Sequence, residues 1–376
     1  MFQIKTHRFG RLTFAATCAI TALAACHQAN PTDRQTEAAM TSPHETVVAA
    51  SKALVPTAPW AEGDQMGMGN TQGPGTWMRC GYHLSQADAR VYELSYERSN
   101  AMPQSPFGVQ LAYEYRPTVG VPYSRHAFNG EHLTSGEPGA QGTQMDALGH
   151  FAVMTEAWIP ESEFPADDAS YYGGYSQQDV KPTPESPLMK LGMEQAAPIV
   201  TSAVLLDAKT FLGGGQAMTP GQRVTKADID GMLEAQGLGW RGILPGDVVY
   251  IYTGWGENWN KDGYYNKGPG LGHDAAKYLA AQNVVLIALD NPFTDPVNDG
   301  QLTGAAGPAE GTPPGLPFAI HHENLTQSGI HNIQNAHLAD LASDKVWTSC
   351  TMILPLRSVG GSGSPIRPVA IGSPQI

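Results

Sequence analysis

Residues 141–151 read Gln-Gly-Thr-Gln-Met-Asp-Ala-Leu-Gly-His-Phe, and this stretch concentrates the polar side chains that decide the fold and its chemistry. Gln144, Asp146 and His150 are spaced i, i+2 and i+6, so on an extended segment all three point to one face. Side chains that bind one ion must converge in this way. Taken alone, however, a carboxylate and an imidazole in a glycine-rich loop are more often a turn cap and an exposed side chain. The surrounding chain therefore decides between the two interpretations.

Continuous apolar runs follow this stretch and predict central β-strands that are covered on both faces of a sheet. Helical signals lie between the runs: Thr225 and Asp228 form a capping box, and Gly237 ends the predicted helix. Alternating apolar residues over 109–115 predict a half-buried strand. Strands interleaved with helices indicate one mixed α/β domain. The predicted core strands span 199–206, 248–252, 284–289 and 346–356, and a second helix spans 274–282.

Residues 140–150, together with segments such as Pro245-Gly246-Asp247-Val248-Val249 and Thr253-Gly254-Trp255, give the chain a family resemblance. It resembles the cyclase-like metal hydrolases, the family of bacterial kynurenine formamidase and isatin hydrolase, whose signature is His-x-Gly-Thr-His-x-Asp-x-x-x-His. The resemblance implies a swivelling β/β/α domain, a mixed sheet with flanking helices, as a single catalytic domain over residues 57–376. Further matching segments are 60–70, 171–179, 204–207, 269–271, 288–290 and 361–365.

When the family signature is aligned with this sequence residue by residue, only some of its positions match. The family's first two ligand histidines fall on Ala140 and Gln144, as in a Gly-Thr-Gln branch of the family, whereas Asp146 and His150 match. His132, upstream of the motif, is an alternative source for the ligand lost at position 140. The resemblance therefore implies a reduced set of metal ligands.

Downstream, the family places a His twelve residues before a Glu. This alignment puts His322 twelve residues before Gln334, so an amide replaces the carboxylate, and a one-residue slip would put His321 in the place of His322. One carboxylate and two imidazoles with neutral amides do not support a tight two-metal site. The resemblance implies one divalent ion, zinc or manganese, with His150 and His322 as catalytic proton shuttles. The expected metal ligands are Gln144, Asp146, His150, His322 and Gln334.

The resemblance therefore implies a metal-dependent hydrolase that acts on a cyclic or N-acyl amide, as arylformamidases do, or on a lactone. A bound ion would activate water, and a histidine would move protons. Two other functions stay open: a non-catalytic lipoprotein that binds a small molecule through a degenerate metal site, and a metal-free lyase or cyclase. The resemblance also implies a homodimer or homotetramer, and the identity of the small-molecule substrate is left open.

The N-terminus carries a targeting pattern. Basic residues Lys5, Arg8 and Arg11 precede the apolar stretch 12–23, and the following Leu23-Ala24-Ala25-Cys26 resembles a bacterial lipobox. We therefore expect a lipoprotein signal peptide at 1–25, lipidation at Cys26 and a flexible tether at 26–56. The expected location is the bacterial cell envelope, lipid-anchored on the periplasmic face of the outer membrane.

Composition excludes several classes of protein. The 376 residues are 41% hydrophobic and 15% charged, and no apolar run approaches the roughly 20 residues of a membrane-spanning helix. A formal net charge of -13 disfavours binding of nucleic acid. Outside the signal peptide and the lipidation site, only Cys80 and Cys350 remain, and the sequence leaves open whether they form a disulfide or two separate buried thiols.

Overall fold

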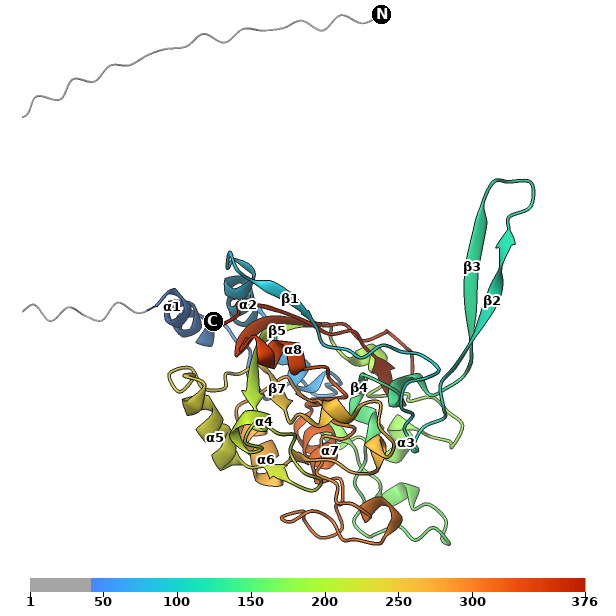
Figure 1. Cartoon of the computed structure of the whole chain (residues 1–376). Helices are drawn as coiled ribbons and strands as arrows, with labels where there is room; N and C mark the ends of the chain where they lie inside the picture. Colours follow the sequence, from blue (N-terminus) through green and yellow to red (C-terminus); the bar gives the residue numbers. More distant parts are fainter. Residues whose placement is uncertain (1–41, 376) are drawn as a thin grey trace, which may run out of the picture. The chain divides into compact units, whose positions relative to one another are not determined.

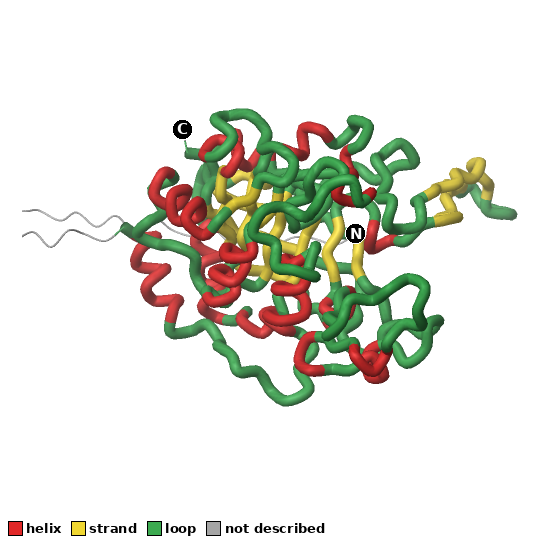
Figure 2. Tube along the Cα trace, turned by 90° about the horizontal axis from the view of Figure 1, so that it is seen from below, coloured by secondary structure: helices red, strands yellow, loops and turns green. Residues whose placement is uncertain are grey.

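The structure is a computed structural model that describes residues 42–375. Its centre is a nine-stranded mixed sheet with the order β1-β13-β11-β5-β7-β9-β10-β4-β12 (Figure 1). The pairs β5-β7, β7-β9 and β9-β10 are parallel, and the other pairs are antiparallel. Figure 2 shows the strands in the interior with helices and loops around them. The strands are β1 (Arg90–Glu93), β4 (Gln144–Asp146), β5 (Ile199–Asp207), β7 (Val248–Tyr252), β9 (Leu286–Leu289), β10 (His331–Gln334), β11 (Thr348–Ile353), β12 (Gly363–Pro365) and β13 (Val369–Gly372).

Side chains of the central strands alternate between two buried faces. In β5, Val204 and Leu206 belong to a core that includes apolar residues of helices α5 (Lys226–Ala235) and α6 (His273–Ala281). Ala203 and Leu205 belong to the core on the other face. Because protein covers both faces, β5 and β7 have continuous apolar sequences instead of alternating ones. The prediction of a single mixed α/β domain with flanking helices is confirmed.

The predicted core strands and helices are present, with ends that differ by a few residues. Helix α5 begins as expected: the Thr225 hydroxyl accepts from the backbone N–H of Asp228, and the Asp228 carboxylate accepts the N–H of Thr225 at 2.8 Å. Gly237, just beyond the helix, has a φ of +69° that suits glycine. The α-helices are α1 (Pro43–Lys52), α2 (Pro74–Leu84), α3 (Gln177–Val180), α4 (Ala208–Phe211), α5 (Lys226–Ala235), α6 (His273–Ala281), α7 (Ala319–His321) and α8 (Ala339–Ser343).

The expectation for residues 109–115 needs correction. The strand starts later, as β2 (Ala112–Gly120), and pairs with β3 (Ala127–Ser135) in a hairpin that extends away from the sheet (Figure 1). Leu111 is 3% exposed, but Val109 is 60% and Tyr115 70% exposed. The alternating pattern thus belongs to a largely solvent-exposed ribbon and not to a half-buried strand of the core. A short parallel pair, β6 (Arg223–Val224) with β8 (Gly270–Leu271), completes the strands.

The end of the predicted tether is also corrected, because residues 43–52 form helix α1. The Ser42 hydroxyl caps this helix, and Val48 and Ser51 are buried against the domain. These two buried side chains are three positions apart on one face of the helix, and so short a pattern does not stand out in a polar segment. The predicted signal peptide, Cys26 and residues 26–41 lie outside the described residues. Within 42–375, no helix is both long and apolar enough to cross a bilayer.

A buried ion pair lies near the start of β7. Arg241 donates to both carboxylate oxygens of Asp247, at 2.7 and 2.9 Å, and Ser202 donates to the same carboxylate at 2.6 Å. Arg79 lies 3.6 Å from Asp247 and donates to Ser202 at 2.8 Å. Burial alone would raise the pKa of Asp247, but the charges of Arg241 and Arg79 lower it. The carboxylate therefore stays ionised and links β5, β7 and α2.

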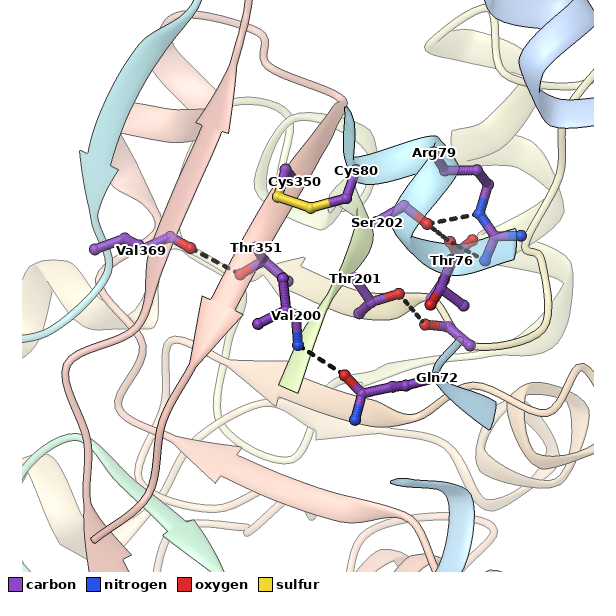
Figure 3. The surroundings of a disulfide bond; sticks show 12 residues. Gln72, Thr76, Arg79, Cys80, Val200, Thr201, Ser202, Cys350, Thr351 and Val369 are labelled. Carbon is purple, nitrogen blue, oxygen red and sulfur yellow. Dashed lines mark hydrogen bonds and ion pairs between the residues drawn. A yellow bond between two sulfur atoms is a disulfide. The ribbon is translucent and has the colours of Figure 1, made fainter. Parts of the chain in front are cut away.

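A disulfide between Cys80 and Cys350 joins α2 to β11 (Figure 3). The two Cα atoms are 4.3 Å apart, and both cysteines are buried. Of the two alternatives that the sequence leaves open, the structure has the disulfide. In Figure 3 the bond lies beside Arg79 and Ser202, so covalent and ionic links hold the same corner of the domain.

Removing the disulfide should lower the free energy of unfolding by about 2–4 kcal/mol, because the two cysteines are 270 residues apart and their bond restricts the unfolded chain. We expect this loss in the double variant Cys80→Ser/Cys350→Ser, measured by urea denaturation. The reduced wild-type protein should unfold at nearly the same urea concentration as the variant. Identical midpoints for oxidised and reduced wild type would contradict the prediction.

Candidate active site

The pairing of two short strands builds the site. β4 lies between β10 and β12, and in its antiparallel register with β10 Gln144 faces Gln334 while Met145 faces Ile333. Met145 and Ile333 are fully buried in the core, so the alternating residues Gln144 and Asp146 point to the opposite face of the sheet. The pairing thus brings together polar residues that are about 190 positions apart.

A closed hydrogen-bond network joins these side chains. The Gln334 amide nitrogen donates to Asp146 Oδ2 at 2.7 Å, and the Gln144 amide nitrogen donates to Gln334 Oε1 at 2.7 Å. Gln144 also donates to Asp146 Oδ1 at 3.4 Å. Behind the carboxylate, His331 Nδ1 donates to the backbone carbonyl of Asp146 at 2.8 Å. The carboxylate is 1% exposed, and the two amides satisfy its oxygens.

His321 completes the network from helix α7. Its Nδ1 lies 2.5 Å from Asp295 Oδ2, and its Nε2 lies 2.9 Å from the Gln334 amide nitrogen and 3.6 Å from Asp146 Oδ2. Asp295 is itself held by the backbone N–H of Ile320 at 2.6 Å. Burial on its own lowers the pKa of His321, but the hydrogen bond and charge of Asp295, with the charge of Asp146, raise it overall. Nε2 therefore accepts the Gln334 N–H while the ring is neutral, and it carries a proton when the ring is charged.

The structure corrects the assignment of His322. Its pKa is lowered, first by burial, and the titratable groups that influence it are Glu323 and His273, neither of which belongs to the network around Asp146. Successive residues of a helix point about 100° apart, so only one of two adjacent histidines can face the network. His321 is followed directly by the π-helix His322–Ser328, whose turns hold more residues than those of an α-helix, and His321 lies thirteen residues before Gln334. Of the two histidines that the sequence leaves open, the structure therefore places His321 in the network.

His150 faces His321 across the pocket. The ring centroids are 6.3 Å apart, and His150 is exposed at the wall of the pocket. Desolvation by this protein lowers the pKa of His150, and the charge of Asp146 offsets the effect only in part. Two imidazoles whose pKa values shift in opposite directions suit a base and an acid in one reaction.

The pocket between these histidines has a volume of about 260 Å³. One end is polar and holds Gln144, His150, His321 and Gln334, with Asp146 behind the two amides. Larger cavities lie elsewhere in the described residues, such as one of about 360 Å³ around Tyr96 and Trp259, but neither His150 nor His321 lines them. Much of the remaining wall of the smaller pocket is aromatic, and Ser105, Glu137, Ala140 and Pro292 also line this pocket. The aromatic residues are Phe107, Phe151, Tyr265, Phe293 and Phe318.

The side chains do not fit the metal site that the resemblance implies. Among residues 42–375, no three His, Cys, Asp or Glu side chains converge closely enough to hold an ion. Amide nitrogens, which are not ligands for cations, face Asp146. Ala140 lines the pocket without a donor atom, and His132 lies exposed on β3.

Sequence reasoning missed Asp295, which orients His321. The sequence holds one weak indication of its role, because Asp295 follows β9 by six residues. Ligands in open α/β sheets bind beyond the carboxyl ends of the parallel strands. A carboxylate in such a loop is a candidate partner for a histidine. Only the fold shows which histidine it meets.

Comparisons with known proteins agree with the fold. The family model described as "Putative cyclase" matches residues 71–296. The crystal structure of a novel cyclase is 22% identical and covers 88% of this chain and 99% of that chain, with a TM-score of 0.65. Isatin hydrolase A from Labrenzia aggregata, bound to benzyl benzoate, is 16% identical and covers 77% and 96%, with a TM-score of 0.52. No curated protein matches the sequence.

The variant Asp295→Asn should lower the pKa of His321, because it removes the charge that favours the imidazolium and keeps an oxygen for the backbone N–H groups. A folded pKa above the unfolded value of about 6.5 contributes stability in full below that pH and loses it as the pH rises through the folded pKa. We therefore expect the variant to lose more stability at pH 5.5 than at pH 9, by urea denaturation, with the imidazole pKa followed by NMR. An equal loss at both pH values would contradict this pairing.

Proposed function

Because the chain belongs to the cyclase family, we propose that it is a hydrolase that opens a cyclic amide or a lactone or cleaves an N-acyl amide, as an arylformamidase does. One observation supports this most directly. Two imidazoles with opposed pKa shifts face each other, 6.3 Å apart, at the polar end of an aromatic pocket. A carbonyl group between them would meet a base on one side and an acid on the other.

The walls of the pocket suggest the class of substrate. Five aromatic side chains favour a flat apolar body, and a volume of about 260 Å³ lies just below the range for small-molecule sites, about 300–1,000 Å³. Glu137 also lines the pocket, so an anionic substrate would meet a like charge there. We therefore propose an uncharged molecule of one or two rings that carries the amide or ester.

Each residue has a role in the proposed reaction. His150, neutral because its pKa is lowered, takes a proton from water as the water oxygen bonds to the carbonyl carbon. Asp295 raises the pKa of His321, so this ring, which accepts the Gln334 N–H at Nε2 while it is neutral, can take up a proton there. It gives that proton to the leaving nitrogen or oxygen as the bond to carbon breaks and its electron pair leaves. The proton on His150 then returns to solvent and His321 is reprotonated, so one water is consumed for each bond cleaved.

Replacing either of the two facing imidazoles should reduce kcat by about 10²–10⁴-fold, because each variant enzyme lacks one of the two groups that transfer protons. The variants are His150→Gln and His321→Gln, tested on a panel of aryl formamides, cyclic imides and aryl lactones by following product carboxylate. Since His322 points away from the network, His322→Gln is the matched control and should keep wild-type kcat.

Other outcomes would decide against the proposal. Tight binding of panel compounds without turnover would indicate a binding protein, and release of an unsaturated product without uptake of water would indicate a lyase. Loss of activity in His322→Gln alone would reverse the assignment of the two histidines.

A further inference from the structure

The network around Asp146 contains a complete substitute for a cation. A buried carboxylate needs either a positive charge or hydrogen-bond donors. Here Gln334 uses one N–H on Asp146 Oδ2 and the other on His321 Nε2, at 2.7 and 2.9 Å. Gln144 uses one N–H on Gln334 Oε1 and the other on Asp146 Oδ1, at 2.7 and 3.4 Å. All four amide hydrogens are used inside the site.

The orientation of both amides follows from these contacts. With Gln334 turned over, its oxygen would lie 2.7 Å from a carboxylate oxygen and 2.9 Å from Nε2 of His321, which lacks a proton in the neutral tautomer with Nδ1–H on Asp295. At both contacts a lone pair of the amide oxygen would then face a lone pair of its neighbour and be repelled by it. The amide nitrogens must therefore face Asp146 and His321, and a cation placed between these residues would meet N–H groups.

We propose that Gln144 and Gln334 have replaced the divalent ion of this site, so that the protein holds Asp146 and His321 in place without a metal. Three departures from the family signature then have one cause: Ala140, Gln144 and Gln334 line one pocket, and each has lost an imidazole or carboxylate ligand. The proposal concerns the same site as the proposed hydrolase, but metal binding is measured without substrate, so the two can fail separately.

The proposal predicts what restores a metal site. In Gln334→Glu, a second carboxylate faces Asp146 at the present 2.7 Å contact, which should lower Tm by several degrees without metal, because two such carboxylates cannot both ionise. Zinc should reverse that loss. The double variant Gln144→His/Gln334→Glu should bind about one zinc per chain and gain at least about 3 °C in Tm at saturating zinc.

The experiment uses the whole chain, stripped with a chelator, dialysed against zinc or manganese chloride alone and analysed for bound metal. The wild type should retain less than about 0.1 ion per chain and show no shift in Tm. Gln110→Glu, at an exposed position, is the matched control for the added charge and should behave as the wild type.

Near-stoichiometric metal in the wild type, with a rise in Tm, would overturn the proposal. A folded double variant that stays metal-free would overturn the assignment of Gln144 and Gln334 as the substitutes. If the double variant does not fold, the wild type and Gln334→Glu still test the proposal. Zinc should leave the Tm of the wild type unchanged and raise the Tm of Gln334→Glu.

Discussion

The register between β4 and β10 is the constraint on which the site depends. Ile333 and Met145 face each other in the core, and this apolar pair fixes Gln334 opposite Gln144 on the other face. A slip by one residue would place the polar side chains in the apolar core and the apolar ones in the hydrogen-bond network, so the register is strongly specified. Because β10 also pairs in parallel with the buried β9, the position of Gln334 is set by the centre of the sheet and not by a loop.

The carboxyl end of β9 supplies two buried carboxylates with different tasks. Asp290 accepts from the N–H and hydroxyl of Thr253 at 2.8 and 2.6 Å, which joins the ends of β9 and β7. Burial raises the pKa of Asp290 to about 6, despite these hydrogen bonds. Asp295, five residues later, has His321 as its partner and serves the pocket. At this edge of the sheet, Asp290 thus stabilises the strand ends, whereas Asp295 orients a histidine of the pocket.

The sequence predicts the scaffold better than the site. Apolar runs and the Thr225 capping box are local signals, and they give the central strands and α5 nearly as the structure has them. Gln144 and Asp146 are also found, because β4 keeps the spacing of an extended chain. The choice between His321 and His322 depends on how the helix turns through a π-helical segment, which no local pattern encodes. Asp295 is likewise invisible until the fold brings its loop to α7.

Replacing a cation with amides also restricts the chemistry that the pocket can support. A metal ion lowers the pKa of its bound water towards 7 and polarises a carbonyl, whereas an imidazole only removes a proton as the bond forms. Without a metal ion, the attacking water and the carbonyl group are both less activated, so the substrate itself must be more reactive. Lactones, cyclic imides and aryl formamides meet this requirement, because ring opening or a stabilised leaving group lowers the barrier, and unactivated amides do not. The amide network therefore favours the small, activated carbonyl compounds that the aromatic walls and the volume of the pocket favour on separate grounds.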